Sequence, residues 1–139
     1  MAEYDCIIFG GRLYAVGIDG LSLIKKNFEK LRGKRLIVFA IGASPMSETT
    51  HSTIRDANLS AQQQSAIKLF YFRGGFDYAA LPLFDKILMT LMKKMILRKQ
   101  RKGKELSSDE AGMLELYDKA VDFTKKEDLQ DLIQAAGMP

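Results

Sequence analysis

The residue that most clearly invites ligand chemistry is Tyr14, an aromatic side chain that follows a glycine pair. Tyr4 to Phe9 is a short apolar run, typical of a strand buried on both faces of a parallel sheet. Gly10 and Gly11 are expected to end this strand, because glycine allows a sharp turn and lets a flat ligand approach the backbone. In open α/β sheets, ligands bind outside the carboxyl ends of the strands. We therefore predict one wall of a binding crevice at Gly10, Gly11, Arg12, Leu13, Tyr14 and Ala15.

A second loop of small residues follows the next predicted strand and comprises Gly42, Ala43, Ser44 and Pro45. We predict that it forms the opposite wall of the crevice. Ser44 and Pro45 also fit a helix N-cap followed by proline at the first helical position. In the simpler alternative, Tyr14 only covers a strand end and the glycines only make the turn.

Other reactive side chains give no recognisable catalytic pattern. His51 has no serine, cysteine or carboxylate partner at a known spacing, which favours a surface or capping histidine. Asp5 and Asp77 are interpreted as turn or strand-end residues. The lone Cys6 excludes a disulfide framework and a cysteine metal site. We therefore name no catalytic residue and no metal ligand.

Three apolar runs predict the strands that would position these loops: Tyr4 to Phe9, Lys34 to Ile41 and Ala66 to Phe72. Helical patterns alternate with them, so we expect an α/β fold with a short parallel sheet and helices on both faces. The predicted helices span residues 21–32, 47–58, 81–98, 108–125 and 127–136, with a surface connection at 59–65. Ser107 and Glu110 form a capping box at the start of the fourth helix.

The composition favours a single domain over residues 1–139, with 47% hydrophobic and 27% charged residues. No apolar run reaches the roughly 18 residues of a membrane span. The acidic N-terminus runs straight into a strand, which argues against a signal peptide. With one cysteine, a reducing cytoplasm is the expected compartment.

The net charge of +4 arises mainly from one segment, Lys93 to Lys104. Its cations are Lys93, Lys94, Arg98, Lys99, Arg101, Lys102 and Lys104. The segment ends a helix with leucine, methionine and isoleucine on one face. The simplest interpretation is a helix packed on the core with a solvated basic end. The alternatives are peripheral docking to an anionic membrane, or binding to an acidic partner. No aromatic residue interleaves the basic run, which disfavours nucleic acid.

These residues together resemble the flavodoxin-like family. The resemblance rests on YDCIIFGGRLYAVGI (residues 4–18), on the strand entry from Gly33 to Phe39, and on FYFRGGFDYAALPLFDKILMTLMKKMI (residues 70–96). Within that family the chain is most similar to flavodoxin-domain proteins related to the oxygen-independent protoporphyrinogen dehydrogenase. The resemblance implies a flavodoxin-like three-layer α/β/α sandwich.

The resemblance also implies a role in flavin-dependent electron transfer or dehydrogenation. The cofactor would be flavin mononucleotide (FMN), and the ring contacts would come from Gly10 to Ala15 and from Gly42 to Pro45. A redox partner protein or a small-molecule substrate would exchange electrons with it. Family members begin with a strand, a phosphate-binding loop, a helix and a second strand, on the order of 50 residues that this numbering lacks. The expected fold is therefore truncated and the expected flavin binding weakened. The alternative is a cofactor-free binding or assembly module on the same scaffold.

The truncation has a consequence for assembly. The first strand would pair in the family with a strand that is missing here, so its outer edge at Asp5 to Phe9 is expected to be open. Open strand edges invite pairing with another chain. We therefore expect a homodimer or larger oligomer that covers this edge.

Overall fold

The computed structural model describes residues 3–117 and 120–137. The chain divides into two compact units. The first unit comprises Met1–Gly42, Met46–Arg73 and Thr124–Pro139. The second comprises Ala43–Pro45 and Gly74–Phe123.

The first unit contains a four-stranded sheet with the order β2-β1-β3-β4. Its strands are β1 (Cys6–Tyr14), β2 (Gly17–Ile18), β3 (Arg35–Gly42) and β4 (Ile67–Arg73). β1 and β4 both pair with β3 in parallel, whereas β2 pairs with β1 antiparallel. The predicted parallel sheet is confirmed, and the α/β fold class with it. The short β2 was not expected.

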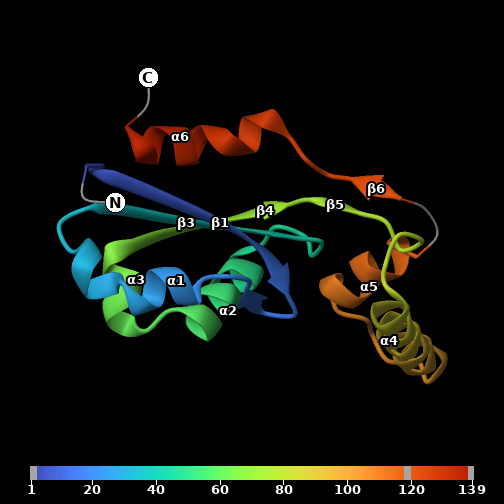
Figure 1. Cartoon of the computed structure of the whole chain (residues 1–139). Helices are drawn as coiled ribbons and strands as arrows, with labels where there is room; N and C mark the ends of the chain where they lie inside the picture. Colours follow the sequence, from blue (N-terminus) through green and yellow to red (C-terminus); the bar gives the residue numbers. More distant parts are fainter. Residues whose placement is uncertain (1–2, 118–119, 138–139) are drawn as a thin grey trace. The chain divides into compact units, whose positions relative to one another are not determined.

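Helices cover both faces of this sheet (Figure 1). On one face lie α1 (Ser22–Lys26), the 3₁₀ helix η1 (Phe28–Leu31), α2 (Glu48–Asn58) and α3 (Ala61–Ala66). On the other face lies α6 (Gln130–Ala136), which is preceded by the 3₁₀ helix η2 (Lys126–Leu129). The first unit therefore has three layers.

The larger core lies between the sheet and the helices α1 to α3. Leu21, Ile24, Phe28 and Leu31 are all buried there, as their helical spacing predicts. The predicted helix over 21–32 is nevertheless divided at Asn27, whose side-chain amide donates to the carbonyl of Leu23. The stripe was thus predicted correctly, and the helix that carries it is less regular than expected.

The smaller core joins α6 to the opposite sheet face. Leu132 and Ala136 pack with Ile37 there, together with half-buried aromatic residues of β3 and β4. The Arg35 guanidinium donates to the carbonyl of Ala136 at 2.7 Å. Gly137 ends the helix with a φ of 71°, a left-handed conformation that favours glycine. The predicted end of this helix is confirmed.

Two predictions about helix starts are wrong. Ser47, not Ser44, caps α2, because its hydroxyl accepts the backbone N–H of Thr50 at 3.0 Å. The predicted surface connection at 59–65 instead contains α3. Ser60 and Gln63 form a capping box at its start, a local signal strong enough to begin a six-residue helix.

The second unit contains α4 (Leu83–Arg101), α5 (Ser108–Glu115) and the paired strands β5 (Gly75–Phe76) and β6 (Val121–Asp122). The predicted long helix and the Ser107–Glu110 capping box are confirmed. The helix predicted over 108–125 is too long, since α5 ends at Glu115 and β6 follows. Residues 118–119 of that prediction lie outside the described residues.

Candidate functional site

The glycine pair lies within β1 and does not end it. β1 continues through Gly10 and Gly11 to Tyr14, so the predicted turn at this pair is wrong. A Cβ atom on Gly10 would lie 2.2 Å from Cζ of Phe39, and one on Gly11 would lie 2.5 Å from the carbonyl oxygen of Asp19. These glycines are required because neighbouring groups lie directly on the strand.

The chain reverses four residues later, in a tight hairpin between β1 and β2. Tyr14 pairs with Gly17, which leaves only Ala15 and Val16 at the turn. Ala15 has a φ of 53°, a conformation that is uncommon for residues other than glycine. Such outliers persist where the surroundings fix them, and they gather at ligand-binding segments. We call residues 12–19 the Tyr14 hairpin.

An ion pair closes the base of the Tyr14 hairpin. Arg12 and Asp19 face each other through their guanidinium and carboxylate groups. The backbone N–H of Asp19 also donates to the carbonyl of Arg12 at 3.0 Å. Because both ends of the hairpin are joined in this way, the tip that carries Tyr14 has a defined position.

Asn58 anchors the hairpin to α2 and was missed by the sequence analysis. Its side chain is buried, with 8% exposure. Its amide oxygen accepts the N–H of Ile18 at 2.9 Å, and its amide nitrogen donates to the carbonyls of Val16 at 2.6 Å and Ile54 at 2.8 Å. Asparagine at a helix end is common, so the sequence offers no signal for this role.

The tip of the hairpin presents an aromatic and an aliphatic side chain to solvent. Tyr14 is 49% exposed and Val16 is 48% exposed. The Arg12 guanidinium carbon lies 5.9 Å from the centroid of the Tyr14 ring, within the range of a cation–π contact. The hairpin thus presents an aromatic ring to solvent.

The ends of β1 and β3 lie side by side, as predicted. Leu13 of β1 adjoins Gly42 of β3, because a Cβ atom on Gly42 would lie 3.2 Å from Cβ of Leu13. Ala43 to Pro45 belong to the second unit, where Pro45 Cγ would lie 3.2 Å from a Cβ on Gly112 of α5. Leu13, Tyr14 and Gly42 therefore lie at one edge of the sheet, whereas Gly10 and Gly11 lie within it, opposite Phe39 and Ala40. The role of Ala43, Ser44 and Pro45 as an opposite wall stays a prediction.

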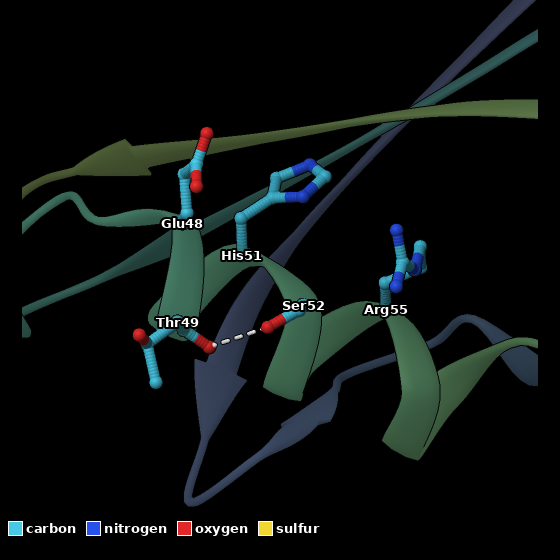
Figure 2. A pocket seen from close by; sticks show the side chains of 5 residues that line it. All are labelled: Glu48, Thr49, His51, Ser52 and Arg55. Atoms are coloured by element: carbon cyan, nitrogen blue, oxygen red, sulfur yellow. Dashed lines mark hydrogen bonds between the residues drawn. The ribbon is translucent and has the colours of Figure 1, made fainter.

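A separate pocket of about 470 Å³ lies over α2 and is lined by Glu48, Thr49, His51, Ser52 and Arg55 (Figure 2). His51 Nε2 lies 2.9 Å from the carbonyl oxygen of Leu69. A carbonyl can only accept, so this nitrogen donates. His51 thus attaches α2 to β4. The Ser52 hydroxyl donates to the carbonyl of Thr49. Among the described residues, no group of three histidine, cysteine or acidic side chains could hold a metal ion.

The longer described helices have N-termini that are poorly suited to a phosphate. A phosphate commonly binds at a helix N-terminus, where backbone N–H groups and the helix dipole attract anions. The described helices of eight or more residues are α2, α4 and α5. Each has a carboxylate in its first turn: Glu48, Asp85 and Glu110, respectively. A carboxylate at that position repels a phosphate.

Comparison with known proteins gives one match. Residues 1–103 match the family model described as a flavodoxin domain. The match includes the whole four-stranded sheet, the Tyr14 hairpin and α4. Neither the curated proteins nor the solved structures contain a match to this chain.

Proposed function

The chain belongs to the flavodoxin-domain family, and on that premise we propose that the Tyr14 hairpin binds the flat ring system of a flavin for electron transfer. A bound flavin would supply the redox chemistry, so the chain itself needs no catalytic acid or base. The observation that carries the proposal is the exposed Tyr14 ring on a fixed hairpin at the carboxyl edge of a parallel sheet. Family members use this edge for ligands.

The proposed binding is dominated by the ring. Tyr14 and Val16 offer apolar surface, and aromatic stacking adds roughly 0.5–1.5 kcal/mol to burial alone. The carboxylates at the helix N-termini offer the phosphate no comparable support. The ring contact therefore accounts for most of the affinity, and FMN and riboflavin bind nearly equally well.

Two versions of this proposal differ in what exchanges electrons with the flavin. If the chain acts as its resemblance to protoporphyrinogen dehydrogenase-like proteins implies, the flavin accepts electrons from a small-molecule substrate. In the other version, the flavin exchanges electrons with a redox partner protein. Both versions require flavin binding at the Tyr14 hairpin, which is tested first.

The test is a titration of the purified chain with FMN and with riboflavin, followed by flavin fluorescence. We expect quenching with dissociation constants on the order of tens of micromolar. The constants for the two flavins should agree within about threefold, whereas a phosphate held by charged hydrogen bonds would separate them by tenfold or more. Tyr14→Ala should weaken binding of both flavins by about tenfold.

Tyr4 provides the matched control, since it is also exposed but precedes the opposite, amino-terminal end of β1. Tyr4→Ala should leave both dissociation constants unchanged. No quenching by either flavin would refute the proposal. Quenching by FMN alone would refute the claim that the flavin ring provides most of the affinity. Equal losses of affinity in Tyr14→Ala and Tyr4→Ala would refute the assignment of the site to Tyr14.

A second candidate function is supported by the outer edge of β1. From Cys6 to Phe9, β1 has β3 as its only strand partner among the described residues. Ile8 of β1 and Ile41 of β3 are also exposed. A strand segment with one open side, beside exposed aliphatic side chains, fits a cofactor-free assembly module. This candidate predicts no quenching of either flavin, so the same titration separates the two.

A further inference from the structure

One side of α4 is covered by residues of the second unit. The Tyr117 hydroxyl donates to the carbonyl of Met89 at 2.7 Å. The hydroxyl groups of Tyr78 and Thr90 are 2.8 Å apart, and Ile96 is buried. These contacts hold the helix by a single face and fix its rotation about its own axis.

The other side of α4 carries large apolar residues that remain exposed. Their exposed fractions range from 45% to 75%, which is unusual for so many on one helix. They recur at helical spacing and so form one continuous surface. We call this surface the apolar stripe; its members are Leu83, Phe84, Ile87, Leu88, Leu91 and Met95. The described residues of the second unit leave this stripe uncovered.

Cations continue the stripe along the same face. Lys94 lies seven residues after Ile87, Arg98 seven after Leu91, and Lys102 seven after Met95. Residues seven apart lie almost above one another on a helix. Arg101 lies seven residues after Lys94 and completes the group, which we call the basic end. All four cations are exposed, and no described acidic side chain pairs with them.

The remaining cations of α4 have other partners. Lys99 pairs with Glu110 at 2.6 Å, and the Lys93 ammonium lies 4.7 Å from the centroid of the Tyr117 ring. Lys86 donates to the carbonyl of Ala79 at 2.6 Å. The helix therefore separates its cations into those that hold the second unit together and those that face solvent beside the apolar stripe. The only acidic residue of α4 is Asp85, at its opposite end.

We propose that the apolar stripe and the basic end dock α4 onto an anionic lipid surface, with the helix axis in the plane of the membrane. Lipid acyl chains would receive the stripe, and anionic headgroups would receive the four cations. With 19 residues the helix is about 28 Å long. None of the described helices is apolar enough over a sufficient length to cross a bilayer.

A second copy of α4 fits this face less well. A parallel pair would bring the basic ends together, and an antiparallel pair would place each basic end against apolar residues. Neither arrangement supplies four compensating anions, since Asp85 is the one acid on the helix. An acidic protein would provide anions for the four cations, but burial of the apolar stripe also requires a broad apolar surface. A lipid surface provides both along one plane.

Vesicle sedimentation tests the proposal with the full chain. Vesicles of phosphatidylcholine containing about 30% phosphatidylglycerol should bind the protein, and added salt should weaken binding. Arg98→Gln with Arg101→Gln should lower the partition coefficient about fivefold per charge. Leu91→Gln should lower it about tenfold. Lys125→Gln with Lys126→Gln removes the same charge from exposed sites on another segment and should change the coefficient little.

The chain has no tryptophan, so Leu91→Trp adds a single fluorescent reporter within the stripe. Its emission should shift to the blue with anionic vesicles and should not shift with polyglutamate. Binding to polyglutamate as tight as to vesicles, without a shift, would overturn the proposal in favour of an acidic protein. A concentration-dependent shift without vesicles would overturn it in favour of a second copy. Equal loss of vesicle binding in the Lys125/Lys126 control would also overturn it.

Discussion

Asn58 determines where the Tyr14 hairpin lies, although it is distant from the hairpin in sequence. Its single side chain satisfies one N–H and one carbonyl of the hairpin and one carbonyl of its own helix. A buried polar group that loses its partner costs roughly 1–3 kcal/mol. The strained φ of Ala15 is held in place partly by these bonds. The position of the hairpin therefore depends on its hydrogen bonds to Asn58.

We predict that Asn58→Ala lowers the free energy of unfolding by about 2–4 kcal/mol, because it leaves the N–H of Ile18 and the carbonyl of Val16 without partners. Urea unfolding followed by circular dichroism measures this loss. Asn27→Ala is the matched control, since the side-chain amide of Asn27 donates to an exposed carbonyl, that of Leu23. A loss below about 1 kcal/mol for Asn58→Ala would show that water replaces its bonds.

The sequence marked Gly10 and Gly11 as positions that need glycine, but for the wrong reason. Gly10 and Gly11 were expected to turn the chain, but they make room for Phe39 and for the backbone at Asp19. Both causes give the same sequence signal, because a turn and a close approach each require a residue without a side chain. The ring that covers Gly10 comes from β3, so only the pairing of the strands reveals it.

The pairing of α4 with α5 depends on one carboxylate that has two functions. Glu110 accepts the backbone N–H of Ser107 in the capping box and also pairs with Lys99 on α4. The Lys99 hydrogen bond, with that from Ser107, lowers the pKa of Glu110 below its ordinary value. The folded state therefore favours the ionised carboxylate. This carboxylate caps the start of α5 and also attaches α5 to α4.

This shift predicts how α5 responds to pH. Because the pKa of Glu110 is lowered in the folded state, its contribution is complete above the unfolded pKa of about 4.3 and is lost as the pH falls through the folded value. The protection factors of the α5 amides, which are corrected for the intrinsic pH dependence of hydrogen exchange, should fall as the solution is acidified from pH 6 to about 3.

The controls for this prediction lie on the same helix. Glu110→Gln should show fast exchange at every pH, once the intrinsic chemical rate is corrected for. Glu115→Gln changes an exposed carboxylate at the end of α5 and should behave as the natural sequence does. If the natural protein and Glu110→Gln show the same pH profile, the capping box and the Lys99 pair do not attach α5.

Among the elements, the long and regular ones were predicted best. β3, β4 and α4 have strong apolar patterns, and their observed bounds lie within three residues of the predicted ones. α3 was missed because six mostly polar residues have no apolar period, and its start depends on Ser60 and Gln63 alone. The pattern of α4 revealed an amphipathic helix but not which side is covered. That depends on Tyr78 and Tyr117, which come from other segments.

For the molecule as a whole, the outer edge of β1 is a feature that favours assembly. Its backbone groups from Cys6 to Phe9 have no strand partner on that side among the described residues. Natural sheets usually protect such an edge with charge, proline or a covering segment. The apolar Ile8 lies on the same strand and does none of these. We therefore retain the expectation of a homodimer or larger oligomer.

Size-exclusion chromatography with light scattering should show a dimer or larger species at micromolar concentration. Ile8→Lys should shift the mass towards the monomer, because a lysine on an edge strand disfavours pairing. Ile133→Lys makes the same change at a side chain of equal exposure, 38%, on α6 and should leave the mass unchanged. A monomer in the natural protein, or equal effects of both variants, would contradict assembly through β1.

The docking of α6 also bears on how the protein is made. Arg35 and Ala136, which join that helix to the sheet, are 101 residues apart. A ribosome adding roughly 5–20 residues per second needs about 5–20 s to travel between them. Throughout that interval the aromatic side chains of β3 and β4 on that face are not covered by α6. A nascent chain stalled before α6 should accordingly attract chaperones, and the released protein should not.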